Sequence, residues 1–444
     1  MDGHSYLRDA DRALEDTYEE PLSLSEYVDR LFEEPTIGAH ASRYLLAAIE
    51  AAGTRTVIEG GERAERYRFF DDPENDGEHA VLGNTDVLND FVTDLRSIAS
   101  ARGNDESILW FAGPTATGKS EFKRCLVNGL RAFSRTPAGK RYTVEWNLAE
   151  SGERGLTYGD AAGESDWHRS PVQAHPLSVF PAETRDAIVA DLNGHAREGV
   201  SIQVGADLDP FSREAYDRLA ERYREQDVPE LFSAVTDPLH LRVTNYVVDV
   251  GQGIGVLHAE DVGGPKERLV GAWMPEMLRE LDSRGRKNPQ AFSYDGVLSQ
   301  GNAGITIIED AAQHADLLGK LLNVSDEGHV KLDKAIGMDV DTQLIVISNP
   351  DLEAQLNQGA ERGGTDPLKA LKRRLTKHEF GYLTEPSLEA ELLRRELTGD
   401  RSVWTGGDAD GDGGSGGEPP VSGMSTGGGT AGAAEREARI RAPV

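Results

Sequence analysis

The sequence of 444 residues has little of several features that would identify whole classes of protein. Its single cysteine, Cys125, excludes an internal disulfide framework and a zinc site built from cysteine pairs. No apolar run reaches the roughly 18–20 residues that a membrane-spanning helix needs. The N-terminus also lacks the basic and apolar regions of a signal peptide. We therefore expect a cytoplasmic protein that does not enter the membrane.

Basic residues are also scarce, because 47 Lys and Arg face 77 Asp and Glu, for a formal charge of −30. This much like charge costs self-repulsion in a compact body, and concentrated salt would screen it. The acidic residues are spread along the whole chain. We favour adaptation to a salt-rich, halophilic cytoplasm over an ordinary acidic protein. Basic residues cluster only at 369–377, so we do not expect nucleic acid to be the main ligand.

What is present fits a globular protein, with 38% hydrophobic and 28% charged residues. Apolar residues recur at helical spacing over much of the N-terminal part, and the end of the chain is rich in Gly, Ser and Asp. Four parts are expected: a helical N-terminal segment at 1–75, an α/β domain at 76–385 with a long insert at about 140–300, a further helix at 386–404, and a disordered Gly-rich tail at 405–444.

One motif has a specific chemical meaning, G-x-x-x-x-G-K-[ST]. Its residues are Gly113, Pro114, Thr115, Ala116, Thr117, Gly118, Lys119 and Ser120. An apolar run ends at Ala112, and an amphipathic helix is expected from Gly118 toward Phe133, which is the strand–loop–helix context of a P-loop. Backbone N–H groups of such a loop surround a phosphate. Lys119 would meet the β- and γ-phosphates and Ser120 would bind Mg²⁺. The alternative is a glycine-rich turn with a solvated lysine.

A second apolar run, Gly304–Ile308, ends in the two acids Glu309 and Asp310. Buried strands of α/β proteins present ligand-binding residues at their carboxyl ends. We expect Glu309 to hold the magnesium ion and its water shell, and Asp310 to polarise an attacking water. The alternative is an ordinary strand that ends in solvated acids.

Three more residues are candidates for catalysis. Asn349 follows the apolar strand 343–348 and could orient the attacking water. Arg373 and Arg374 lie in a basic segment, and one of them could reach the γ-phosphate of a neighbouring subunit, a contact that contributes about 10³–10⁵ in rate in known systems. A solvated basic pair is the alternative. The chain has no N-K-x-D element, which favours ATP over GTP, and no H-R-D or D-F-G sequence of the usual protein kinases.

With these motifs in order, residues of about 20–385 resemble the PrkA family, described as serine protein kinases built on an AAA+ domain. The resemblance includes the loop at 113–120 and the stretch 288–296, NPQAFSYDG, which is similar to the family's DPRAFNFDG. Residues 304–331 also resemble AAA+ transcriptional activators. The resemblance implies an AAA+ P-loop NTPase with a parallel sheet flanked by helices, ATP and Mg²⁺ as ligands, self-association, and phosphorylation of a protein serine. The helix at 386–404 would be part of the lid.

Two departures from these families keep several functions open. The activators place Asp before Glu at the strand end, whereas here Glu309 precedes Asp310. PrkA proteins continue into a long C-terminal domain with kinase character, where this chain has its Gly-rich segment. The sequence therefore leaves three hypotheses: a Mg-ATP-binding and hydrolysing module of a PrkA-like kinase, an ATP-gated oligomeric adaptor or regulator without kinase activity, and an energy-dependent protein unfoldase. The protein substrate or partner stays unidentified.

Overall fold

The computed structural model describes residues 3–100, 108–147, 167–195, 202–204, 207–273, 292–321, 324–325, 328–331, 337–361 and 367–399. All structural statements below concern these residues. The expected tail at 405–444, the end of the expected helix at 386–404 and part of the stretch 288–296 lie outside them. Among the helices in these ranges, none combines the length and the apolar character needed to cross a membrane.

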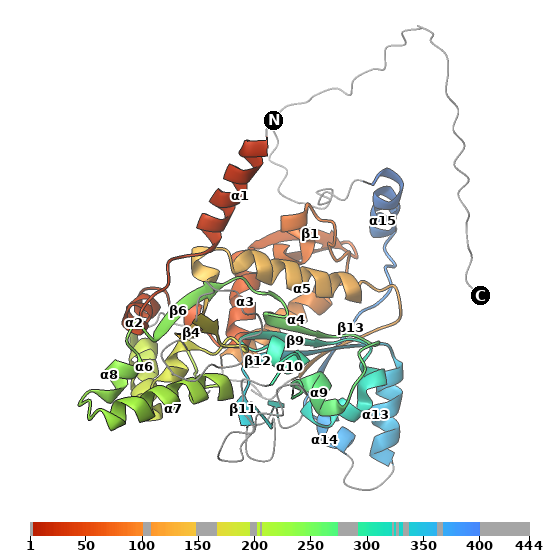
Figure 1. The fold of residues 1–444 in the computed structure, drawn as a ribbon. Helices are drawn as coiled ribbons and strands as arrows, with labels where there is room; N and C mark the ends of the chain where they lie inside the picture. Colours follow the sequence, from red (N-terminus) through yellow and green to blue (C-terminus); the bar gives the residue numbers. More distant parts are fainter. Residues whose placement is uncertain are drawn as a thin grey trace. The chain divides into compact units, whose positions relative to one another are not determined.

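The centre of the fold is a six-stranded parallel sheet flanked by helices (Figure 1), which confirms the expected α/β class. Its strands follow one another in the order β13 (Leu375–Glu379), β3 (Ile108–Ala112), β12 (Thr342–Ser348), β9 (Gly304–Ile308), β8 (Gly253–Leu257) and β7 (Asp249–Val250). Strands β3 and β9 are buried at every residue. Parallel strands covered on both faces carry nearly continuous apolar runs, which is why the sequence indicated them.

Helices cover both faces of this sheet and form two apolar cores. On one face, Phe111 of β3 packs with Phe91 and Phe122, whose ring centroids lie 5.2 and 4.2 Å from its own. The helices of this face are α3 (Ala41–Ala51), α4 (Thr85–Ala99) and α5 (Lys119–Phe133). The core of the other face includes residues of α9 (Pro265–Leu269), α10 (Val297–Gln300), α11 (Ala315–Leu318), α13 (Asp351–Glu361) and α14 (Pro367–Lys372).

Part of the expected insert forms a second sheet with its own core. Three antiparallel strands lie in the order β5 (Trp167–Arg169), β4 (Arg141–Asn147) and β6 (Leu241–Tyr246). They pack with α2 (Leu24–Glu33), α6 (Ala182–His195), α7 (Pro210–Glu225) and α8 (Leu231–Val235) around the buried Trp146 and Tyr27. The insert does not run unbroken to about residue 300, because β7 and β8 return to the main sheet at residues 249–257.

The sequence interpretation expected a helical segment at 1–75, and the structure shows that this is wrong in part. Between α1 (Gly3–Thr17), α2 and α3 on one side and α4 on the other lies an antiparallel hairpin, β1 (Thr54–Glu59) and β2 (Glu62–Tyr67). Gly60 and Gly61 form its turn with φ of +62° and +82°, a conformation that favours glycine. A Gly-Gly pair between polar–apolar alternations is a hairpin signal, and it was overlooked.

Two other parts of the chain differ from the sequence interpretation. The sequence predicts one helix over 311–322, whereas residues 311–318 form a 3₁₀ turn, Ala311–His314, and the short α11. The basic segment near Arg373 ends α14 and leads directly into β13, a strand that the sequence interpretation missed. A short ribbon of β10 (His329–Lys331) and β11 (Gly337–Asp339) and a last helix, α15 (Pro386–Thr398), complete the described elements.

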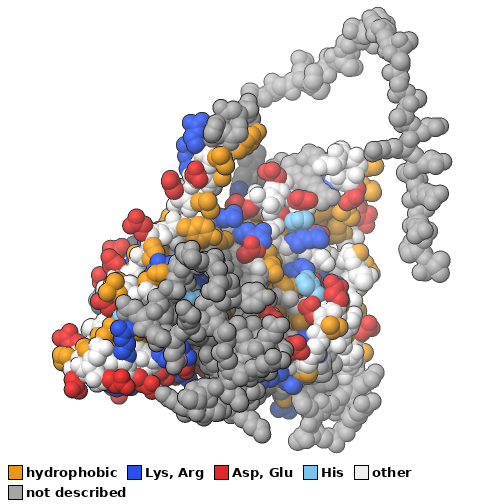
Figure 2. All heavy atoms as spheres, in the orientation of Figure 1, with side chains coloured by type: hydrophobic (Ala, Val, Ile, Leu, Met, Phe, Trp, Pro, Cys, Tyr) orange, Lys and Arg blue, Asp and Glu red, His pale blue; other side chains and the backbone are white. Residues whose placement is uncertain are grey.

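Acidic side chains are spread over many elements of the face drawn in Figure 2, α7 included, with basic side chains between them. This distribution follows the sequence, in which acid is not confined to one segment.

Candidate functional site

The predicted site residues, Arg373 and Arg374 excepted, lie at the carboxyl edge of the main sheet. Strands β3, β12, β9 and β8 are parallel, so the segments that follow them lie at one edge. The loop 113–120 follows β3, Asn349 follows β12, and Glu309 and Asp310 follow β9. Strand β12 lies between β3 and β9 in the sheet. This edge is where α/β folds bind ligands.

The loop 113–120 has a backbone that few sequences could adopt. Ala116 and Gly118 have φ of +63° and +91°, in the left-handed region. Gly113 lies so close to the chain after β13 that an added Cβ would come within 2.5 Å of the Phe380 carbonyl oxygen. Gly118 caps the N-terminus of α5, whose first N–H groups have no partner within the helix. The loop therefore combines a tight turn with a helix N-terminus, the arrangement that binds phosphate.

The side chain of Lys119 is buried against the backbone of its own loop. Its Nζ donates a hydrogen bond to the Gly113 carbonyl at 2.7 Å and another to the Pro114 carbonyl. Burial lowers the pKa of Lys119, and the attraction of Asp310 opposes that shift. The loop backbone thus holds the ammonium in place, and the Asp310 carboxylate after β9 attracts it. Ser120, the next residue, is exposed on the first turn of α5.

Glu309 is held by two side chains that sequence reasoning missed. Lys123 Nζ lies 2.9 Å from Glu309 Oε2, and His258 Nδ1 lies 2.8 Å from the same oxygen. Lys123 is one turn after Ser120 on α5, so both residues lie on the helix face that looks toward Glu309. His258 directly follows the short buried strand β8. The apolar run GIGVL before His258 could have indicated a strand with a site residue at its end. The sequence interpretation did not recognise it as a strand.

The residues present fit a magnesium ion that is shared with phosphate. No group of three or more His, Cys, Asp or Glu side chains in the described ranges could hold a metal ion by itself. Magnesium commonly takes one or two protein oxygens and completes its shell with water and substrate phosphates. The Ser120 hydroxyl and the Glu309 carboxylate, on facing elements, are suitable protein ligands of this kind.

Asp310 and Asn349 lie at the same edge with different surroundings. Asp310 is exposed and has φ of +43°, which turns the chain sharply after β9. Asn349 is half-buried after β12. The residue before it, Ser348, is buried and accepts a hydrogen bond from Trp110 of β3 at 2.8 Å, so the end of β12 is tied to the strand that precedes the loop. Asn349 thus follows a strand, β12, that lies between the strands preceding the loop and Glu309.

Arg373 and Arg374 do not join this site in the chain itself. They lie between α14 and β13, at the amino end of β13, where the Ile108 N–H donates to the Arg374 carbonyl at 2.9 Å. Ile108 begins β3, and the loop 113–120 follows the other end of that strand. The two arginines are thus at the edge of the sheet opposite to their own loop. A role at a phosphate would require the loop of another subunit.

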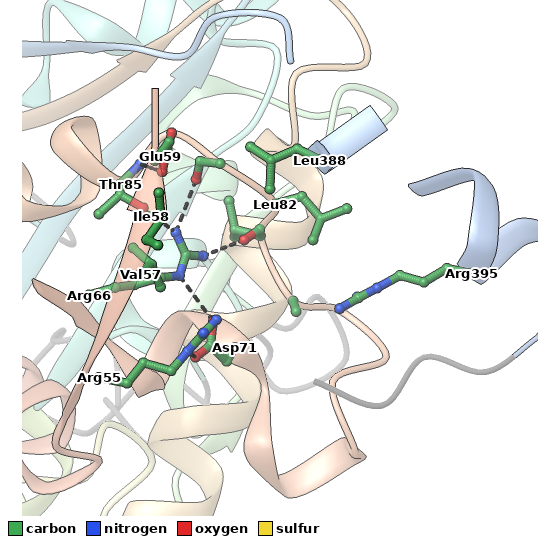
Figure 3. Close-up of a pocket in the computed structure, with 13 residues that line it drawn as sticks. Arg55, Val57, Ile58, Glu59, Arg66, Asp71, Leu82, Thr85, Leu388 and Arg395 are labelled. Atoms are coloured by element: carbon green, nitrogen blue, oxygen red, sulfur yellow. Dashed lines mark hydrogen bonds and ion pairs between the residues drawn. The ribbon is translucent and has the colours of Figure 1, made fainter. Parts of the chain in front are cut away.

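A small pocket is lined by residues of the hairpin, of the segment 80–85 and of α15 (Figure 3). Its volume is about 40 Å³, room for a few water molecules. Val81 in its wall comes within 3.8 Å of the point where a Cβ on Gly118 would lie. Gly83 lies against Leu383 and Leu388 at the start of α15. Sequence reasoning did not find this pocket, because its residues come from three separate segments.

In this parallel sheet, β3 is followed by a glycine-rich loop with a buried lysine. Two strands away in the sheet, β9 is followed by two acids. These features define a P-loop domain of the AAA type. The model of one family, the PrkA AAA domain, matches residues 22–358. The chain belongs to this family.

Curated relatives are more distant. The chain is 22% identical over 316 residues to the protein named serine/threonine kinase YeaG of Escherichia coli K12, and equally to those of strains O6:H1 and O157:H7. The match covers 70% of this chain and 42% of each relative, so the chain spans less than half of the relatives' length. Among solved structures, NtrX from Brucella abortus matches with a TM-score of 0.29 at 10% identity, over 73% of this chain and 45% of that one.

Proposed function

We propose that this chain binds Mg-ATP at the loop 113–120 and hydrolyses it, as the AAA module of a PrkA-like protein. One observation carries the proposal: the Lys119 ammonium is buried in a left-handed glycine loop and is attracted by Asp310 from β9. A buried ammonium that donates mainly to backbone carbonyls is unusual in a core, and it suits a phosphate ligand. Membership in the PrkA AAA family supports the same assignment.

In this proposal each residue has one task. The N–H groups of the loop and Lys119 bind the phosphates, and Ser120 and Glu309 hold the magnesium ion, which supplies charge neutralisation at the phosphates when bound. Asp310 accepts a proton from the attacking water, and Asn349 orients that water. Val81 and the chain near Phe380, which adjoin the loop, form the side on which the nucleotide's base lies.

The phosphate assignment is tested by Lys119→Ala. We expect the loss of a charge-assisted contact of about 1.5–3 kcal/mol, which weakens Mg-ATP about ten- to a hundred-fold. Isothermal titration calorimetry in molar KCl measures the affinity. Arg124→Ala, which removes an exposed arginine of the same helix that pairs with Glu121, is the matched control and should keep the affinity. Equal titrations of ATP into Lys119→Ala and the unchanged protein would reject the loop assignment.

A second candidate is an ATP-gated adaptor that turns over slowly. The order Glu309–Asp310 favours it, because the shorter Asp310 side chain follows the metal-binding position and reaches less far. Phosphate release in molar KCl, compared between the unchanged protein and Asp310→Ala, separates the two functions. A rate that falls at least tenfold supports the hydrolase. Near-zero rates that cannot be told apart support the adaptor.

Phosphorylation of a protein serine is proposed from the family alone. The relatives named serine/threonine kinase are more than twice as long as the matched region. The assay is incubation of the chain with labelled ATP and a casein-like protein. Label on the protein's serine supports a kinase, whereas label on nucleotide products alone assigns this chain only ATP hydrolysis.

Self-association follows if Arg373 or Arg374 acts at all, because both lie at the edge of the sheet opposite to the loop. The mass in solution, measured with and without Mg-ATP, tests this. In an assembly, adding catalytically inert Lys119→Ala subunits that keep their arginines should restore hydrolysis to Arg373→Ala/Arg374→Ala subunits. No restoration in a mixed assembly would remove the two arginines from the mechanism.

A further inference from the structure

The guanidinium of Arg66, a residue of β2, is buried in the wall of the small pocket in Figure 3. It donates from Nε to Asp71 Oδ1 at 3.0 Å, and from its terminal nitrogens to the Thr85 hydroxyl at 2.9 Å, the Gly83 carbonyl at 3.1 Å and the Val81 carbonyl (Figure 3). Only 3% of Arg66 is exposed. A single side chain of the hairpin therefore holds three groups of the segment 81–85, the loop that leads into α4.

This arrangement costs free energy that a fold could avoid, through repulsion between like charges and through burial of charged groups. Arg55 lies directly opposite Arg66 in the hairpin, and like charges in that position repel. Both guanidiniums converge on Asp71, with Arg55 Nε 2.6 Å from Asp71 Oδ2. Burial of such groups costs free energy that apolar side chains of similar size would not. What the guanidinium provides, and an apolar side chain does not, is a planar fork that fixes the positions of three acceptors.

The held segment lies between the phosphate loop and α15. Val81 adjoins Gly118 of the loop, while Gly83 adjoins Leu383 and Leu388. The side chains of Val81 and Leu82 line the pocket on this side. A shift of the segment would therefore change the pocket while leaving Lys119 and the turn at Gly113 in place.

We propose that Arg66 is a positioning residue which fixes the segment 81–85 as the wall against which the nucleotide's purine base packs. The inference rests on the nucleotide binding proposed above and adds a division of labour to it. The loop 113–120 holds phosphate, and Arg66, without touching the nucleotide, determines how well the base is held. A ligand that has phosphates but no base does not depend on Arg66.

The test compares Mg-ATP with Mg-tripolyphosphate, which lacks the base, by calorimetry on the full chain in molar KCl. In Arg66→Met, we expect the Kd of ATP to rise about tenfold, the effect of losing roughly one or two buried apolar groups, and the Kd of tripolyphosphate to stay unchanged. Arg63→Met, an exposed arginine of the same strand, is the matched control and should change neither. Lys119→Ala should weaken both ligands.

The outcomes separate this inference from the proposed function. An unchanged protein that binds neither ligand rejects the nucleotide assignment itself. An Arg66→Met variant that weakens both ligands equally, or neither, overturns the inference alone. If Arg66→Met does not fold, the milder Arg66→Lys and Thr85→Val replace it, since each keeps a buried partner for part of the network. Folded forms of both, shown by circular dichroism, that bind ATP like the unchanged protein also overturn the inference.

Discussion

Two clusters in this protein each pair one carboxylate with two basic side chains, and they differ in solvent exposure. Asp71 is paired with Arg55 and Arg66, and the three side chains are 6%, 13% and 4% exposed. Glu309 is paired with Lys123 and His258, and these are 19%, 20% and 46% exposed. The first carboxylate is enclosed by the fold. The second can be reached from the surface at the carboxyl edge of the sheet.

The difference shows how one kind of contact serves two purposes. The Asp71 oxygens accept hydrogen bonds from two guanidiniums, and that of Arg66 also donates to the Val81 and Gly83 carbonyls, so the pair with Arg66 cannot separate without leaving a buried charge unpaired. The partners of Glu309 are flexible or half-exposed and can return to water at little cost. An enclosed cluster fixes a shape, and an accessible cluster can exchange its partners for a metal ion.

The largest effect is expected for Asp71→Asn. The change keeps the size of the side chain and removes the counter-charge of the buried Arg66 and the partly buried Arg55, so the free energy of unfolding should fall by about 3–5 kcal/mol. Chemical denaturation in molar KCl measures it. Glu50→Gln, which removes an exposed pair with Arg96, is the control and should cost no more than about 1 kcal/mol. Equal losses in the two variants would contradict the contrast.

Glu309→Gln should act on catalysis and not on the fold. We expect the rate of phosphate release to fall about a hundredfold or more, because a metal ligand is lost, while the free energy of unfolding changes by less than about 1 kcal/mol. Both are measured on the same preparation. Glu353→Gln, at an exposed ion pair with Lys377, controls for the loss of one surface charge. A stability loss as large as that of Asp71→Asn would show that Glu309 is structural.

The buried imidazole of His175 extends the contrast to pH. Burial, aided by the charge of Arg141, lowers the pKa of His175 to about 3. The unfolded chain gains this proton near pH 6.5, so stability falls as the pH drops from there toward 3. Between pH 7.5 and 5 this amounts to about 2 kcal/mol, and His175→Gln should remove that part of the pH dependence. Denaturation at both pH values tests it, with the partly exposed His168 mutated to Gln as control. An unchanged slope would contradict the assignment.

The smallest effect is expected for Lys123→Met. Its ammonium competes with a metal ion for Glu309, so the Mg²⁺ affinity of the ATP-bound protein should rise about threefold, in keeping with a half-exposed ion pair. Titration of Mg²⁺ at saturating ATP measures it. Lys372→Met, which loses an exposed bond to Asn357, is the control for charge. A weaker Mg²⁺ affinity would mean that Lys123 orients Glu309 and does not compete for it.

Much of the fold could be predicted because its central strands carry their signal locally. Strands β3, β9 and β12 are short apolar runs stopped by turn residues, and the sequence interpretation found all three. It missed β8 and β13. The charged pattern of β13, Leu375–Glu379, resembles a surface helix, and only its pairing with β3 makes it a strand. The hairpin of β1 and β2 was missed because helix was expected throughout the segment.

The sequence by itself determined the loop 113–120 and the acids after β9, because a phosphate-binding turn needs particular residues at fixed spacing, whatever surrounds it. It also determined the acidic charge of the surface. Only the tertiary structure decided what lies next to these residues: Lys123 and His258 at Glu309, and Arg66 behind the segment 81–85. These side chains come from elements that are far apart in the chain, and their contacts depend on how the sheet orders its strands. Arg373 and Arg374 lie at the opposite edge because they directly precede β13. That segment is a strand only through its pairing with β3.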